Sequence, residues 1–182
     1  DCAGTVLRAL GELGLDKNTL VIYTSDHGEM LGEHGLWQKF EFYEGSCGIP
    51  LLIRTPGNAA GGVSRVPISQ VSLLPTLGDL CNVPITGPQD GGSFAALVRR
   101  PGAERQLRPV FAEYNLGNPR AKYMIRDGDF KLTYWTHDNP ELYNLRTDPE
   151  EMTNLASRRE YQKTVETLKQ KLFVWHRPQE IS

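Results

Sequence analysis

A short apolar and β-branched run at residues 20–24, Leu-Val-Ile-Tyr-Thr, most constrains how this chain folds. Runs of this kind form strands that are buried on both faces of a parallel sheet. Apolar residues recur with helical spacing over residues 2–13, and Gly14 offers a stop, so an amphipathic helix is expected just before the strand. The order of helix and strand indicates an α/β domain.

Polar residues with metal-binding and anion-binding capacity follow this strand. Asp26 and His27 come just past its C-terminal end, the edge where ligands bind in open α/β sheets. Asp26 offers carboxylate oxygens and His27 an imidazole nitrogen, so the pair is half of a metal site. Lys39 follows thirteen positions after Asp26, across a loop that contains Gly32 and Gly35 and is long enough to fold back. A cation and an ammonium at one place favour a tetrahedral oxyanion.

The remaining pattern predicts a second part with a different architecture. A second buried strand over residues 48–54 and a helix over residues 72–80 complete the first part. Four short strands then predict a small antiparallel sheet, with Asp127-Gly128 as a two-residue hairpin turn, at residues 110–114, 122–126, 130–135 and 141–145. Tyr161, Val165, Leu168 and Leu172 form the apolar stripe of a last helix that packs on this sheet. We place the boundary between the two parts, residues 1–88 and 89–182, at residue 88.

Composition and charge exclude several classes of function. The formal net charge is −2 and the isoelectric point is near 6.1, so no basic field attracts nucleic acid. No apolar run approaches the roughly 20 residues that span a bilayer, so no membrane partner is expected. Residues 1–4 show neither an initiator Met nor a signal peptide. Cys2, Cys47 and Cys81 lack the spacing of a disulfide framework or a zinc knuckle.

Several ordered motifs carry a family resemblance. They are Ser25-Asp-His-Gly-Glu29, Leu31-Gly-Glu-His-Gly35, Lys39, Tyr43-Glu44, Ile49-Pro-Leu-Leu-Ile53 with Pro56-Gly57, and later stretches at residues 126–132, 141–145 and 148–155. In order and spacing they resemble the second half of the type I, formylglycine-dependent sulfatases of the alkaline phosphatase superfamily, with the choline-sulfatase and iduronate-sulfatase branches most similar. The resemblance implies part of a parallel-sheet α/β domain, followed by a C-terminal α+β subdomain with a small antiparallel sheet and a packed helix.

The resemblance also implies roles for particular residues. Asp26 and His27 become ligands of a divalent cation, usually calcium in this family, and Lys39 becomes the sulfate-binding cation. His34 lies in the family's loop near the substrate and is a candidate without an assigned role, since a loop histidine is commonly solvent-exposed. Ligand chemistry leaves the ion open, because calcium takes about six to eight mostly oxygen ligands and a nitrogen ligand suits zinc or manganese better. His137, in a loop near the C-terminal strands, is expected to be a surface residue, although this loop could reach the rim of the site.

The family's nucleophile has no counterpart in this sequence. The resemblance implies a formylglycine made from a Cys or Ser in a Cys/Ser-x-Pro/Ala-x-Arg motif, and no Cys or Ser of the chain fits. The expected function is therefore the C-terminal portion of a metal-dependent sulfatase that hydrolyses small-molecule or carbohydrate sulfate esters, with the nucleophile upstream. The chain alone is expected to be inactive, and its apolar strands are expected to bind the N-terminal half, aggregate or form a homo-oligomer.

Two alternatives stay open at this point. Phosphate and sulfate are both tetrahedral oxyanions, so the same frame supports phosphonate monoester or phosphodiester hydrolysis. The chain is alternatively a non-catalytic binding or assembly module derived from a sulfatase, which is consistent with the absent nucleophile motif.

Overall fold

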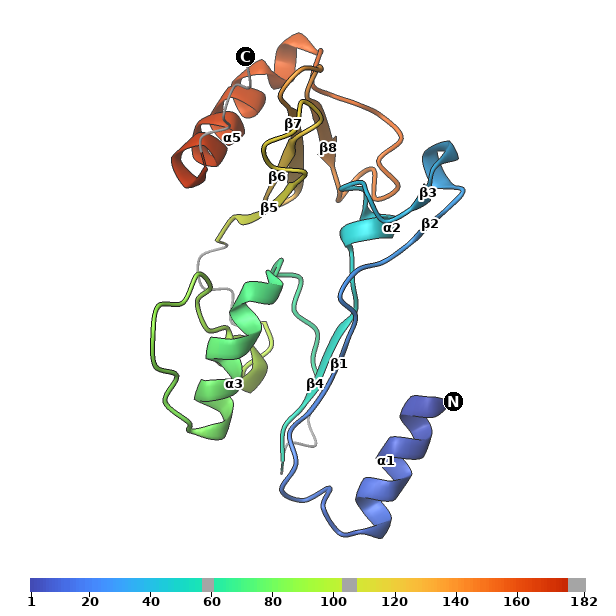
Figure 1. Ribbon diagram of the computed structural model, residues 1–182, viewed down its shortest axis with the longest axis vertical. Helices are drawn as coiled ribbons and strands as arrows, with labels where there is room; N and C mark the ends of the chain where they lie inside the picture. The colour runs from blue at the N-terminus through green and yellow to red at the C-terminus, as the bar shows by residue number, and fades with distance from the viewer. Residues whose placement is uncertain (57–60, 103–107, 177–182) are drawn as a thin grey trace. The chain divides into compact units, whose positions relative to one another are not determined.

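The structure, a computed structural model, describes residues 1–56, 61–102 and 108–176 (Figure 1). The described residues fall into two compact units. Unit 1 draws on Asp1–Ser25, Pro50–Arg65 and Gln70–Ala103, and unit 2 on Asp26–Ile49, Val66–Ser69 and Glu104–Ser182. The candidate site residues Asp26, His27, His34 and Lys39 all belong to unit 2. The boundary at residue 88 stays a prediction.

Unit 1 begins with the predicted helix, and its elements are α1 (Cys2–Glu12), β1 (Val21–Thr24), β4 (Leu51–Arg54), η2 (Gln70–Ser72), α3 (Leu73–Cys81) and α4 (Ala95–Arg99). Gly14 ends α1 with a φ of 67°. The N–H of Gly14 bonds to the carbonyl of Gly11 and that of Leu15 to the carbonyl of Leu10, which is a Schellman motif. None of the residues of α1 is buried.

The two apolar strands of unit 1 differ from the sequence prediction in their pairing. β1 and β4 pair with each other antiparallel, in register from Val21 opposite Arg54 to Thr24 opposite Leu51. Tyr23 is 55% exposed and Leu52 61%, so neither strand is buried on both faces by the described residues. Pairing direction depends on where the chain reverses between Thr24 and Leu51, which the apolar character of each run does not encode.

Unit 2 contains a small antiparallel sheet covered by a helix, as predicted. The strands β5 (Val110–Tyr114), β6 (Lys122–Asp127), β7 (Phe130–Trp135) and β8 (Glu141–Asn144) pair in sequence order. After η3 (Arg159–Tyr161), the helix α5 (Gln162–Trp175) contacts β6 and β7. The core between them includes Ile125, Leu132, Leu142, Val165, Leu168 and Leu172. The predicted apolar stripe of α5 is therefore its buried face.

The β6–β7 hairpin turn lies one residue later than predicted. Asp127 pairs with Phe130 as the last pair of the ladder, so the two turn residues are Gly128 and Asp129. Gly128 has a φ of 59°, a conformation that glycine adopts without a Cβ clash. The burial of Ile125 and Leu132, which lie opposite each other, fixes this register because a one-residue slip would turn both side chains to the other face.

The remaining elements of unit 2 come from the same stretch of sequence as the candidate site residues: β2 (Met30–Leu31), η1 (Glu33–Gly35), β3 (Trp37–Gln38) and α2 (Glu44–Cys47). β2 and β3 pair antiparallel, with Met30 opposite Gln38. Met30 is 1% exposed and packs close to Gly45 of α2. Among the helices that the structure describes, none combines the length and the apolar character needed to cross a membrane.

Candidate functional site

Asp26 is the first candidate ligand, two residues beyond the end of β1. Its side chain is 85% exposed, and its Oδ1 accepts the N–H of His27 at 3.0 Å. Hydrogen bonds from its own backbone N–H and from that of His27 lower the pKa of this carboxyl group below its ordinary value. Asp26 is thus a carboxylate at neutral pH, the form that binds a cation.

His27 is held in one tautomer by its neighbour. Its Nδ1 lies 2.6 Å from the carbonyl oxygen of Gly28. A carbonyl oxygen only accepts, so Nδ1 carries the hydrogen, and the neutral ring presents the lone pair of Nε2 on its other side. Histidines that bind metals are commonly oriented in this way, by a hydrogen bond from the second ring nitrogen.

Lys39 lies directly at Nε2, the second ring nitrogen of His27. Its Nζ donates to Nε2 at 2.6 Å, and Oδ2 of Asp26 lies 3.5 Å from the same Nε2. The structure therefore brings Asp26, His27 and Lys39 together, although Lys39 comes from the loop after β3 and is twelve residues from His27.

The Asp26–His27 pair fits a divalent cation as part of a ligand set. The carboxylate of Asp26 lies beside Nε2 of His27, on the side of the ring where this nitrogen carries its lone pair. The ring is oriented by the contact of Nδ1 with the carbonyl oxygen of Gly28. Within residues 1–56, 61–102 and 108–176, no group of three or more His, Cys, Asp or Glu side chains could hold a metal ion. A cation here would need further ligands besides these two side chains.

Backbone contacts hold Gly28, the residue after His27, against α2. The N–H of Gly28 donates to the carbonyl oxygen of Ser46 at 2.7 Å. A Cβ atom at Gly28 would lie 2.1 Å from the carbonyl oxygen of Gly45, far inside van der Waals contact. Only glycine allows this approach, so the glycine after His27 is required for packing against α2.

A buried ion cluster holds α2 on the small sheet. Lys131 of β7 is 1% exposed, and its Nζ donates to the carbonyl oxygen of Phe42 at 2.7 Å and to Oε1 of Glu44 at 2.9 Å. It also pairs with Oε1 of Glu151 at 2.5 Å. Burial acts to lower the pKa of Lys131, but nearby Cys47, Glu44 and Glu151 raise it overall, so the ammonium stays charged.

Glu151 completes this cluster from the other side. It is 2% exposed, and its Oε2 accepts the N–H of Glu44, the first residue of α2, at 2.6 Å. The sequence patterns do not predict this cluster of Glu44, Lys131 and Glu151. The one available signal was a lysine inside the apolar run of β7, between Phe130 and Leu132.

His34 makes packing contacts within unit 2. Its ring stacks on Tyr43 with centroids 4.0 Å apart, and its Nε2 lies 3.0 Å from the carbonyl oxygen of Glu150. Its φ of 54° is left-handed, which is uncommon for a residue with a side chain. These contacts hold the loop between β2 and β3.

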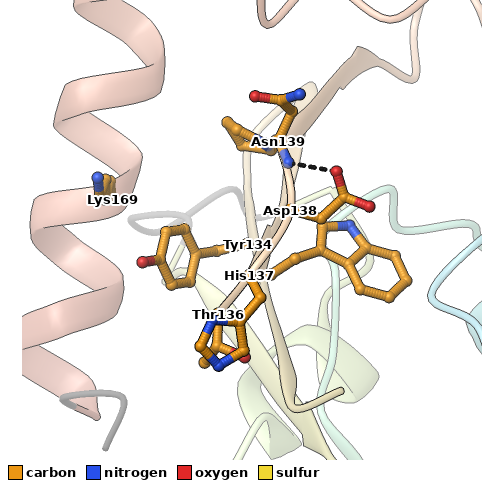
Figure 2. A pocket seen from close by; sticks show the side chains of 8 residues that line it. Tyr134, Thr136, His137, Asp138, Asn139 and Lys169 are labelled. Atoms are coloured by element: carbon orange, nitrogen blue, oxygen red, sulfur yellow. Dashed lines mark hydrogen bonds between the residues drawn. The ribbon is translucent and has the colours of Figure 1, made fainter. Parts of the chain in front are cut away.

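His137 lies in a separate polar hollow of about 410 Å³ around the end of β7 (Figure 2). Figure 2 shows Tyr134, Thr136 and His137 around this strand end, with Lys169 of α5 across from them. Neither Asp26, His27 nor Lys39 lines this hollow. His137 is exposed, as expected of a surface residue.

Comparison with known proteins shows which protein family the chain resembles. Residues 32–177 match the family described as N-sulphoglucosamine sulphohydrolase, C-terminal. A choline-sulfatase from Rhizobium meliloti (strain 1021) is 39% identical over 157 residues, 84% of this chain and 30% of that protein. An arylsulfatase K from Danio rerio is 38% identical over 161 residues, 85% of this chain and 31% of that protein.

Solved structures show the same fold. One, in complex with its substrate D-glucosamine-2-N,6-O-disulfate, matches with a TM-score of 0.82 and 32% identity, covering 93% of this chain and 36% of that one. A phosphonate monoester hydrolase of Agrobacterium radiobacter matches with a TM-score of 0.76 and 28% identity, covering 94% and 38%.

The chain therefore has a sulfatase fold of the alkaline phosphatase superfamily and belongs to the family of N-sulphoglucosamine sulphohydrolase C-terminal regions. The resemblance read from the sequence and the α/β fold class are confirmed. The chain spans about a third of the length of the relatives that it matches.

Proposed function

We propose that the complete protein is a metal-dependent sulfatase and that this chain supplies part of its metal site and its sulfate-binding lysine. The observation that carries the proposal is that Oδ2 of Asp26 and Nζ of Lys39 lie 3.5 Å and 2.6 Å from Nε2 of His27. Sulfatases generally use a metal and a formylglycine, and this chain contains no motif for the latter. The nucleophile is accordingly assigned to the N-terminal half.

Each residue of the proposed site has a distinct task. Asp26 and His27 would hold a divalent cation, which would act as a Lewis acid toward a sulfate oxygen. Nε2 has one lone pair, so it cannot serve Lys39 and a metal ion at once. Lys39 would therefore leave Nε2 when the metal binds, and its ammonium would donate hydrogen bonds to sulfate oxygens and stabilise the charge that develops on them.

Calcium is the proposed ion because the family resemblance favours it, while the nitrogen of His27 suits zinc or manganese better than calcium. The proposed substrate is a small-molecule or carbohydrate sulfate ester. It is supported by the choline-sulfatase relative and by the structural neighbour that binds a disulfated glucosamine. Neither a nucleic acid nor a membrane is part of the proposal.

The proposed partner of this chain is its own N-terminal half. Several apolar side chains of unit 1 are exposed: Val6 and Leu7 of α1 to 60% and 43%, and Leu13, the residue that follows α1, to 71%. Tyr23 of β1 is also more than half exposed. Upstream elements that cover these faces would bury them, as the sequence prediction of a fully buried strand requires. Without that half, we expect self-association of the chain.

Turnover by the complete protein tests the proposal. We expect hydrolysis of 4-nitrophenyl sulfate that a chelator abolishes and a divalent cation restores. The 182-residue chain alone should show no turnover. Turnover that is insensitive to chelation would contradict the metal site, and the absence of any ester hydrolysis by the complete, metal-loaded protein would favour the non-catalytic module.

Phosphonate monoester hydrolysis is the second candidate, favoured by the structural match to the Agrobacterium radiobacter hydrolase. The two functions are separated by the ratio of kcat/KM for 4-nitrophenyl sulfate to that for 4-nitrophenyl phenylphosphonate, measured on the same preparation. A ratio above one supports the sulfatase, and a ratio well below one supports the phosphonate hydrolase.

His34→Ala separates a packing role of His34 from a catalytic one. The variant loses the stack on Tyr43 and the contact with the carbonyl of Glu150, so we expect a loss of about 1–2 kcal/mol in the free energy of unfolding. We expect kcat to fall less than tenfold when it is measured below the unfolding transition. A fall of a hundredfold or more in a folded variant would restore His34 as a catalytic candidate.

A further inference from the structure

Ser46 connects the two segments that carry the proposed site. It lies in α2 and is 3% exposed. Its Oγ donates to the backbone carbonyl oxygen of Lys39 at 2.9 Å, and its own carbonyl oxygen accepts the N–H of Gly28 at 2.7 Å. One buried residue thus bonds to the backbone of Lys39 and to the residue that follows His27.

The position of Ser46 is itself fixed. Glu151 accepts the N–H of Glu44 at the start of α2, and Lys131 bonds to the carbonyl of Phe42 and the carboxylate of Glu44. The close approach of Gly28 to Gly45 limits movement on the other side. These contacts hold the backbone around Ser46 in place on both sides.

The backbone just before Lys39 needs such a support. Gln38 has a φ of 76°, a left-handed conformation that a residue with a side chain adopts at an energetic cost. Conformations of this kind persist when the surroundings hold them. The hydrogen bond from Ser46 acts one residue further on, at the carbonyl of Lys39, and opposes relaxation of Gln38 to an ordinary conformation.

We propose that Ser46 is a positioning residue for Lys39: its hydroxyl holds the lysine backbone so that the ammonium stays at the Asp26–His27 edge. The proposal rests on the proposed function, in which Lys39 binds the oxyanion. The hydroxyl of Ser46 acts through Lys39, since its acceptor among the described residues is the carbonyl oxygen of Lys39. Removal of the hydroxyl should weaken anion binding without weakening metal binding.

Ser46→Ala in the complete, metal-loaded protein tests this role. We expect the inhibition constant of inorganic sulfate to rise about three- to tenfold, the loss of one hydrogen bond, with an unchanged affinity for the metal. Ser46→Cys, with a weaker donor, should fall between serine and alanine, and it decides the question if the alanine variant does not fold. An unchanged sulfate inhibition constant in both variants would overturn the proposal.

Thr76→Val is the matched control. Thr76 is 1% exposed, and its Oγ1 donates to the carbonyl of Ser72 and accepts the N–H of Phe94 in unit 1. The control should lose stability without any change in the sulfate inhibition constant. If both variants weaken sulfate binding equally, the effect follows general stability and the positioning role is wrong.

A double-mutant cycle with Lys39→Ala separates this inference from the proposed function. If Ser46 acts through Lys39, adding Ser46→Ala to Lys39→Ala should cause no further loss of kcat/KM for a sulfate ester. Independent, multiplicative losses would overturn the positioning role and leave the proposed function intact. An unchanged kcat/KM in Lys39→Ala alone would overturn both.

Discussion

Lys39→Ala in the complete protein should lower kcat/KM for a sulfate ester by about a hundredfold to a thousandfold. That is the typical effect of removing one fixed donor that stabilises charge in a transition state. The ammonium of Lys39 lies 2.6 Å from Nε2 of His27, so it is the positive side chain placed to meet an anion held at that edge. Steady-state kinetics with saturating metal measure the effect.

The same variant should not weaken metal binding. In the structure Lys39 occupies the lone pair of Nε2 and places a positive charge beside the carboxylate of Asp26, so its removal favours a cation. Lys163→Ala, on the exposed face of α5, is the matched control and should stay within twofold of the parent. A metal affinity that falls together with kcat/KM would contradict a separate anion-binding role for Lys39.

Lys131→Met should lower the free energy of unfolding of the complete protein by about 3–5 kcal/mol. The variant leaves the carboxylate of Glu151, whose side chain is 1% exposed, without its ammonium partner, and an unpaired buried charge is costly. Glu44 also loses this partner but is 31% exposed and keeps its ion pair with Arg126. Denaturant unfolding measures the loss. Because α2 carries Ser46, we also expect weaker inhibition by sulfate.

Two further variants test the origin of that loss. Lys171→Met removes a lysine that is 48% exposed and paired with Asp127, and should cost no more than about 1 kcal/mol. Adding Glu151→Gln to Lys131→Met removes one unpaired charge and keeps an acceptor for the N–H of Glu44, so part of the stability should return. Equal losses in Lys131→Met and Lys171→Met would contradict the buried cluster.

The elements with local patterns could be predicted from the sequence. α1 and α5 follow a helical spacing of apolar residues, and β5 to β8 follow short apolar runs separated by turn residues. Asp26 and His27 stood out because they come directly after a strand. The meeting of these two residues with Lys39 was also foreseen, from loop length and family resemblance.

Features that depend on distant residues could not be predicted in this way. Glu44 and Glu151 are 107 residues apart, and Lys131 and Glu44 are 87 apart, so no local pattern joins them. The antiparallel pairing of β1 with β4 depends on the path of the chain between them. The role of Ser46 is set by a backbone carbonyl, which sequence patterns do not show.

A crystal structure of the complete protein grown with Ca²⁺ and sulfate would show directly whether Asp26, His27 and Lys39 form one site for a metal ion and an oxyanion. We expect an ion bound by the carboxylate of Asp26 and by Nε2 of His27, with Nζ of Lys39 moved off Nε2 and within hydrogen-bonding distance of a sulfate oxygen. An ion bound elsewhere, or Lys39 still donating to Nε2 beside a bound sulfate, would contradict it.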